Sequence, residues 1–313
     1  MLIALVGAIV ILAIAMMMFI NRVMPSAYAV PDVPGQQWLK TASGTIRYQV
    51  MGEGDTAVLF LHGFNSHLGQ WEGVWTRLRS SPYRFVRIDL PGYGQSSWRE
   101  SDFTLSAQAS RVVSLMDHLK LERAVLVGTS MGGSLAAWIA SRNPNRVSGL
   151  ALLAPSGYPG SLTYPGLFGW LIRPGPAHAA ARWICSTSIY GTLFPRSRAR
   201  QALSVTAGYG EPWADSLRGI ATPTVILWAR GDPTTNSDAA AAVNASIGGS
   251  VLLLLDKSTG HGIASTRPDL VAYIVMQLLG GNSPELTLRH LPDGMVHPGE
   301  EMRLSEPQDS YRY

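Results

Sequence analysis

The chain has 313 residues, a formal net charge of +4 and a single cysteine, Cys185. One cysteine excludes an intramolecular disulfide, and the basic residues form no run interleaved with aromatic side chains, so we expect no nucleic-acid partner. The length allows one large domain with a sizeable core and nothing more elaborate.

The chain begins with an apolar segment, residues 2–20, that contains no charged side chain. As a helix rising ~1.5 Å per residue it is long enough to cross a ~30 Å hydrocarbon core. It predicts a transmembrane anchor over residues 1–24, a linker over 25–37 and a single-pass membrane protein. A secretory signal is the alternative, because residues 27–29 read Ala-Tyr-Ala, but the run is long and follows no Lys or Arg. Arg22 alone favours a cytoplasmic enzyme, so the side of the membrane stays open.

An apolar strand is predicted over residues 57–61, and it runs into the turn His62-Gly63-Phe64. Backbone N–H groups in such a turn can face a cleft, so the amide of Phe64 is a candidate donor to an oxyanion. We expect His62 itself to be a hydrogen-bonded structural residue.

The strongest chemical signal lies in residues 122–133, which read Glu-Arg-Ala-Val-Leu-Val-Gly-Thr-Ser-Met-Gly-Gly. A buried strand over 124–127 is followed by a turn and then by an apolar helical pattern. Gly128 and Gly132 allow the strand and the helix to approach closely, and the strained turn presents Ser130 at the N-terminus of the helix. Ser130 is therefore the predicted nucleophile, and the amide of Met131 is the second candidate oxyanion donor.

A nucleophilic serine needs a base and an acid that orients the base. The apolar strand predicted over residues 224–229 is followed by Asp232, which we favour as the acid. Asp256, which abuts its own strand, and Asp238, which resembles a helix N-cap, are weaker alternatives. For the base we favour His261, which follows the strand predicted over 251–255 and lies between two glycines that free it to point into a cleft.

The chain order Ser, Asp, His belongs to one triad-bearing fold and differs from the chymotrypsin and subtilisin orders. The motifs 62–64, 89–97, 128–133, 231–232 and 260–261 together resemble the α/β-hydrolase superfamily over residues 38–280. The resemblance implies a mostly parallel sheet with helices on both faces. It also implies the triad of Ser130, Asp232 and His261, and a structural loop that begins at Asp89.

Two further segments complete the predicted domain organisation. Residues from about 155 to 220 interrupt the strand–helix alternation and predict a helical cap, whose apolar residues either form a pocket wall or bury the cap's own contacts. The tail, residues 281–313, is rich in Pro, Glu, Ser and Asp and predicts disorder.

Serine at position 130 argues against relatives resembling haloalkane dehalogenases and epoxide hydrolases, which use aspartate there. The predicted function is a membrane-anchored serine hydrolase, similar to carboxylesterases and lipases, that cleaves an apolar carboxylic ester through an acyl-enzyme. The alternatives are a carbon–carbon bond hydrolase of diketone ring-fission products and a non-catalytic binding scaffold. The sequence contains no Walker loop, no H-E-x-x-H and no Cys/His metal spacing, so neither a cofactor nor a metal is predicted. The predicted partners are a small apolar acyl substrate and the membrane; the oligomeric state is open.

Overall fold

The structure is a computed structural model. It describes residues 12, 15, 18, 30–98, 102–163, 172–173, 175–193, 199–292, 294–297 and 299–305.

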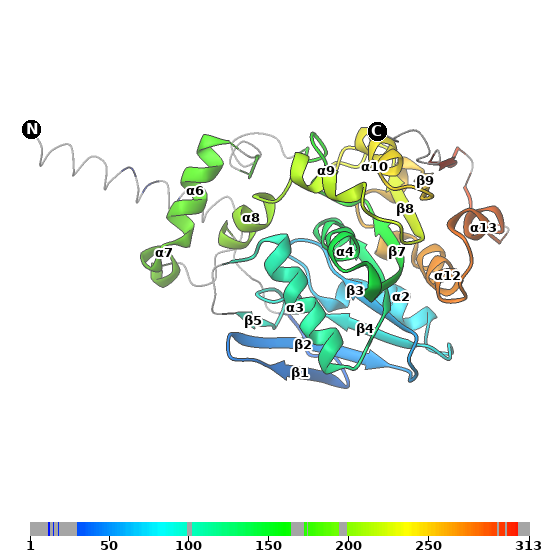
Figure 1. The fold of residues 1–313 in the computed structure, drawn as a ribbon, viewed down its shortest axis with the longest axis horizontal. Helices are drawn as coiled ribbons and strands as arrows, with labels where there is room; N and C mark the ends of the chain where they lie inside the picture. Colours follow the sequence, from blue (N-terminus) through cyan, green and yellow to red (C-terminus); the bar gives the residue numbers. More distant parts are fainter. Residues whose placement is uncertain are drawn as a thin grey trace, which may run out of the picture.

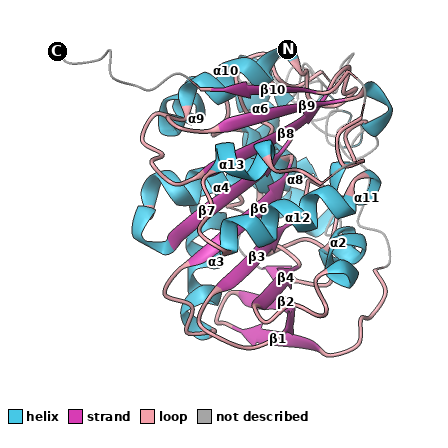
Figure 2. Cartoon of the chain, turned by 90° about the vertical axis from the view of Figure 1, so that its right-hand side faces the viewer, coloured by secondary structure: helices cyan, strands magenta, loops and turns pink. Residues whose placement is uncertain are grey.

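A ten-stranded sheet has the strand order β1-β2-β4-β3-β6-β7-β8-β9-β10, with β5 paired to β2 (Figures 1 and 2). The series from β4 to β9 in this order is parallel, whereas β1, β2, β5 and β10 pair antiparallel with their neighbours. This is the mostly parallel sheet that the sequence predicts. The strand bounds are β1 Gln36–Lys40, β2 Gly44–Met51, β3 Ala57–Leu61, β4 Arg84–Ile88, β5 Ser97–Trp98, β6 Ala124–Thr129, β7 Val147–Leu153, β8 Thr224–Ala229, β9 Val251–Leu255 and β10 Glu301–Leu304.

Helices cover both faces of the sheet. On one side α4 packs against β3, β6 and β7 and is flanked by α3 and α9; on the other, α12 packs against the same strands beside α2, α11 and α13 (Figures 1 and 2). Strands covered on both faces are mostly apolar, and β3, β6, β8 and β9 are buried at every residue. The helix bounds are α2 Glu72–Arg77, α3 Leu105–His118, α4 Met131–Arg142, α6 Pro176–Ser186, α7 Ser188–Leu193, α8 Ala199–Thr206, α9 Glu211–Leu217, α10 Asp238–Ser246, α11 Ile263–Thr266, α12 Pro268–Leu279 and α13 Pro284–Arg289, with short 3₁₀ turns η1 Leu68–Trp71, η2 Pro144–Arg146 and η3 Lys257–Thr259.

A helical insertion separates β7 from β8, as the predicted cap requires. It contains α6, α7, α8 and α9, of which α9 packs on α4 and α10. The limits of the cap at 155 and 220, like the other domain boundaries, stay predictions. Several of the apolar side chains on which the cap prediction depended lie outside the described residues, namely Leu167, Phe168, Trp170, Leu171 and Phe194.

The predicted single-pass membrane location is contradicted. In the part of the chain that the structure describes, no helix combines the length and the apolar character needed to cross a bilayer. The helix α3, with 14 residues, illustrates the shortfall, because it covers only ~21 Å of a ~30 Å core. The segment over 2–20 that carried the prediction lies outside the described residues, apart from Leu12, Ala15 and Met18.

Part of the tail for which the sequence predicts disorder forms regular elements in the structure. Within 281–305 the chain forms α13 and then β10, which pairs antiparallel with β9 through Glu301–Leu254 and Leu304–Val251. Leu288 of α13 is buried against the main core. These contacts are long-range and leave no periodic pattern in the local sequence, which explains the difference. Residues 306–313 lie outside the described part.

Candidate active site

The predicted triad residues follow three strands of the parallel series, which end at one edge of the sheet. Ser130 directly follows β6, Asp232 lies in the loop after β8, and His261 lies in the loop after β9. Because parallel strands place their carboxyl ends at a common edge, residues far apart in the sequence reach one region.

Ser130 lies in a strained turn between β6 and α4. Its backbone has φ 52° and ψ −118°, a conformation that residues other than glycine rarely adopt. Three backbone hydrogen bonds hold it: the Ser130 amide donates to Leu153 O at 2.8 Å, and the Ser130 carbonyl accepts from the amides of Ser134 at 3.0 Å and Ser156 at 3.2 Å. The side chain is therefore held at the end of the sheet by its neighbours.

The two glycines around Ser130 are required by close backbone approach. A Cβ atom on Gly132 would lie 2.1 Å from Leu61 O, and one on Gly128 would lie 2.2 Å from Gly132 O. Both obstacles are backbone atoms that cannot rotate away. The glycines thus allow β6, α4 and the end of β3 to meet beside the serine, as the sequence predicts.

Asp232 and His261 form a hydrogen-bonded pair. His261 Nδ1 lies 2.7 Å from Asp232 Oδ2, and Oδ1 accepts from the amides of Thr234 at 2.7 Å and Thr235 at 3.1 Å. Burial acts to raise the pKa of Asp232, but the bond and charge of His261 and the two amides outweigh it, so the pKa lies below its ordinary value. The carboxylate is thereby ionised and fixed, while the His261 side chain remains 25% exposed.

The two alternative acids lie elsewhere. The Asp256 carboxylate accepts from the amide of Ser258 at 2.8 Å, and the Asp238 carboxylate accepts from Asn236 Nδ2 at 3.1 Å. The N-cap residue of α10 is Ser237, and Asp238 is the first residue of the helix. Asp238 therefore lies one position after the N-cap that the sequence predicts for it. Neither carboxylate hydrogen-bonds His261, so the geometry favours Asp232.

No hydrogen bond joins Ser130 to His261, both of which belong to the described part of the chain. In proteins free of substrate, such a bond is often long and tightens only when substrate binds. The structure therefore joins the acid to the base by a hydrogen bond and places Ser130 at the same edge of the sheet.

The predicted oxyanion donors lie beside Ser130. Phe64 and Met131 both line a pocket with Ser130, and the Gly63 backbone approaches so closely that a Cβ there would lie 3.5 Å from Ser130 Cβ. In the described part of the chain neither the Phe64 nor the Met131 amide has a hydrogen-bond acceptor. His62, by contrast, is buried and accepts from the Leu90 amide at 3.0 Å, which is the structural role we expected.

Asp89, which begins the motif of residues 89–97, is structural as well. Its side chain accepts from the amides of Leu68 and Gln95, both at 2.7 Å, and forms a fully buried ion pair with Arg47 at 3.3 Å. Its oxygens face the backbone of neighbouring loops and not the pocket.

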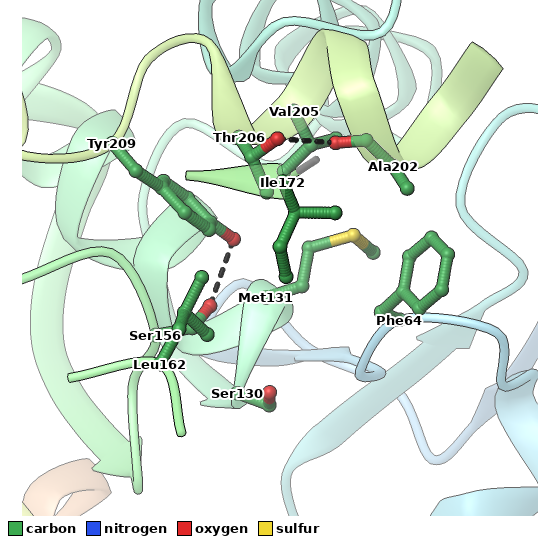
Figure 3. A pocket seen from close by; sticks show the side chains of 10 residues that line it. All are labelled: Phe64, Ser130, Met131, Ser156, Leu162, Ile172, Ala202, Val205, Thr206 and Tyr209. Carbon is green, nitrogen blue, oxygen red and sulfur yellow. Dashed lines mark hydrogen bonds between the residues drawn. The ribbon is translucent and has the colours of Figure 1, made fainter. Parts of the chain in front are cut away.

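The pocket beside Ser130 has a mostly apolar wall (Figure 3). Among the apolar residues of the cap, Ile172 lines the pocket, whereas Tyr190 is buried away from it and Trp183 and Leu193 are exposed. The lining residues are Phe64, Ser130, Met131, Ser156, Leu162, Ile172, Ala202, Val205, Thr206 and Tyr209.

A family model described as alpha/beta hydrolase fold matches residues 56–172. The chain has the α/β-hydrolase fold. The enol-lactonase from Burkholderia xenovorans LB400 superposes with a TM-score of 0.62 at 21% identity, over 78% of this chain and 100% of that one, and so shares the fold.

Two curated relatives extend the comparison of this α/β-hydrolase. Monoacylglycerol lipase abhd6-A of Xenopus laevis is 24% identical over 270 residues, which cover 75% of this chain and 78% of the relative. The dihydrolipoyllysine-residue acetyltransferase component of the acetoin cleaving system of Cupriavidus necator is 40% identical over 133 residues. That match covers 42% of this chain and spans only 33% of the relative.

Some residues that line the pocket of this α/β-hydrolase were not predicted from the sequence. Ser156 follows β7, and its hydroxyl lies 2.7 Å from Tyr209 OH and 3.0 Å from the hydroxyl of Ser134 (Figure 3). The Ser134 hydroxyl also donates to Ser130 O at 3.2 Å, so these hydroxyls connect the pocket wall to the turn. The sequence around Ser156 contains no motif that marks it as part of the pocket.

Proposed function

We propose that this α/β-hydrolase is a serine hydrolase that cleaves an apolar carboxylic ester through an acyl-enzyme. The observation that carries the proposal is the strained turn of Ser130, which opens into an apolar pocket at the sheet edge where His261 is hydrogen-bonded to Asp232.

In the proposed mechanism, Ser130 Oγ attacks the ester carbonyl carbon while His261 Nε2 accepts the hydroxyl proton. Asp232 holds the Nδ1 proton and stabilises the imidazolium. The amides of Phe64 and Met131 donate to the oxyanion of the tetrahedral intermediate. The intermediate collapses as His261 returns the proton to the leaving alkoxide, which departs as the alcohol.

The acyl-enzyme is then hydrolysed by the same groups. His261 accepts a proton from water, whose oxygen attacks the acyl carbon, and the second intermediate releases the carboxylic acid as the proton passes to Ser130. We favour an apolar acyl group because seven of the ten residues that line the pocket have apolar or aromatic side chains. These are Phe64, Met131, Leu162, Ile172, Ala202, Val205 and Tyr209. The name of the monoacylglycerol lipase relative supports the same substrate class.

The test combines a fluorophosphonate probe with p-nitrophenyl esters of graded chain length. The wild-type protein should be labelled at Ser130 and hydrolyse the esters. Ser130→Ala should abolish labelling and lower kcat by a factor on the order of 10⁶. Ser258→Ala, which changes an exposed serine on the loop of His261, is the matched control and should retain both activities.

Other outcomes would point elsewhere. Continued labelling of Ser130→Ala would assign the nucleophile to another serine. Labelling without ester turnover, together with cleavage of a diketone, would favour the carbon–carbon bond hydrolase, which uses the same residues. A wild-type protein that neither reacts with the probe nor turns over substrate would favour the binding scaffold.

A further inference from the structure

The C-terminal segment, residues 294–297 and 299–305, contacts the loop that carries His261. Glu300 is central to this contact because its side chain is fully buried. Its Oε1 accepts from Arg267 Nη1 at 2.5 Å and from the Asp256 amide at 3.3 Å, and its Oε2 accepts from the His297 amide at 2.9 Å. The Glu300 carboxylate therefore accepts hydrogen bonds from one side chain, that of Arg267, and from two backbone amides, those of Asp256 and His297.

Two of these donors mark the ends of the His261 loop, which we define as residues 256–267. Asp256 directly follows β9, and Arg267 directly precedes α12. Arg267 also donates from Nη2 to Met295 O at 2.5 Å. Glu300 thus connects the first and last residues of the loop and ties both to the C-terminal segment.

His261 lies between two glycines, whereas Thr259, Ile263 and Ala264 on either side of them are buried. Gly260 has a φ of 59°, and Gly260 and Gly262 both face open space where a side chain would lie. Glycines allow many backbone conformations, so the direction of His261 depends on how the flanking residues are held, and Glu300 fixes both ends of that segment.

The loop of Asp232 is tied to the same segment. Arg230, two residues before Asp232, donates from Nη2 to Gly299 O at 3.3 Å and to Glu301 Oε2 at 3.0 Å. This ion pair is about 40% exposed and contributes little by itself, whereas the Glu300–Arg267 pair is shielded from water.

We propose that Glu300 is a positioning residue, which holds the ends of the His261 loop so that the imidazole stays aligned with Asp232 and Ser130. The inference rests on the proposed function, because it assumes that His261 is the base. Glu300 acts through the loop and does not touch substrate. A misplacement of about 1 Å in a catalytic group can cost up to about 10²-fold in rate, so a looser loop should lower kcat.

The test compares Glu300→Ala and Glu300→Gln with Glu285→Gln. Glu285 is a suitable control because it also lies in the C-terminal part and pairs with an arginine, but the pair joins residues of α13 only and is exposed. We would measure kcat per active site titrated with fluorophosphonate, KM for a p-nitrophenyl ester, and the downfield proton resonance of the His261 Nδ1–H bonded to Asp232.

We expect Glu300→Ala to lower kcat about 10- to 100-fold with little change in KM, because the pocket lies on other elements. Glu300→Gln keeps one acceptor oxygen and the same volume, so it should restore part of the rate. Both should weaken or broaden the His261 resonance, and Glu285→Gln should match the wild type. If Glu300→Ala does not fold, the comparison of Glu300→Gln with Glu285→Gln decides.

The proposal would be overturned if Glu300→Gln kept the wild-type kcat per titrated site and an unchanged His261 resonance. The proposal would also be overturned if the variants contained fewer active sites that react with fluorophosphonate but kept the wild-type kcat per site, because Glu300 would then only stabilise the fold. Failure of the proposed function looks different, since the wild type would then lack labelling and turnover. The His261 resonance of the variants would still test positioning in that case.

Discussion

The carboxylate of Asp232 accepts four hydrogen bonds, from the amides of Thr234 and Thr235, the Thr235 hydroxyl and His261 Nδ1. An ionised carboxylate held in this way fixes the tautomer of the imidazole, which leaves Nε2 free to accept a proton. The two threonines fix the carboxylate itself, so the orientation of His261 depends on a short local turn.

Exchange of the two candidate acids tests this assignment. Asp232→Asn keeps the shape of the side chain but donates where it should accept, so kcat should fall on the order of 10⁴-fold, as expected for a triad acid. Asp256→Asn is the matched control, because this aspartate caps η3, and it should change kcat less than about twofold. Steady-state kinetics on a short-chain ester would measure both. A severe loss in Asp256→Asn with a mild one in Asp232→Asn would reverse the assignment.

The depressed pKa of Asp232 also predicts a dependence of stability on pH. A carboxyl whose pKa is lower in the folded state stabilises the fold at pH values above its unfolded pKa of about 3.9, and this stabilisation is lost as the pH falls through the folded pKa. When the pH falls from 6 to 3, the Tm of the wild type should therefore decrease relative to the Tm of Asp232→Asn. Calorimetry across that range would measure it, and a constant difference would contradict the prediction.

At the scale of elements, the turn between β6 and α4 was predictable because its causes are local. The apolar strand, the serine and the glycines all lie within residues 124–133, and the strained φ of Ser130 follows from their order. Asp232 and His261 were predictable for the same reason, since each follows an apolar strand closely. The distance between them depended on the strand order, which only the structure supplies.

The pocket wall could not be predicted in this way. Val205 and Thr206 come from α8, and Tyr209 follows that helix, in a segment with no motif. Their approach to Ser130 depends on how the insertion folds over the sheet. Residues of this kind are chosen by shape and packing, so the local sequence holds no signal for them.

Gly132→Ala tests whether the close approach of β3 and α4 supports the site. The added Cβ would lie 2.1 Å from Leu61 O, so backbone must move, and we expect a loss of about 1–3 kcal/mol in the free energy of unfolding. Because Gly132 follows Met131, fluorophosphonate labelling should also slow. Gly208→Ala is the control, since its Cβ would meet nothing closer than 3.8 Å. Equal stability of the two variants in urea unfolding would contradict this account.

At the scale of the whole molecule, the C-terminal segment completes the sheet. β9 has the sequence Val-Leu-Leu-Leu-Leu and is buried along its length, and without β10 it would be an edge strand. An apolar, unpaired edge readily pairs with other chains. β10 is mostly exposed, carries Glu301 and Arg303, and so covers this edge with a charged strand. Its composition is why sequence analysis predicts disorder for the segment.

Shortening the chain at two points separates this role from that of the last residues. A chain that ends after Gly294 lacks β10 and Glu300, so it should lose Tm, form aggregates through the exposed edge of β9 and retain little turnover. A chain that ends after Ser305 keeps every contact described for the segment and should match the full-length protein in all three respects. Calorimetry, light scattering and ester hydrolysis on both chains would measure the effects. If the chain that ends after Gly294 were monomeric and had an unchanged Tm, β9 would not need to pair with β10. The C-terminal segment would then not stabilise the sheet.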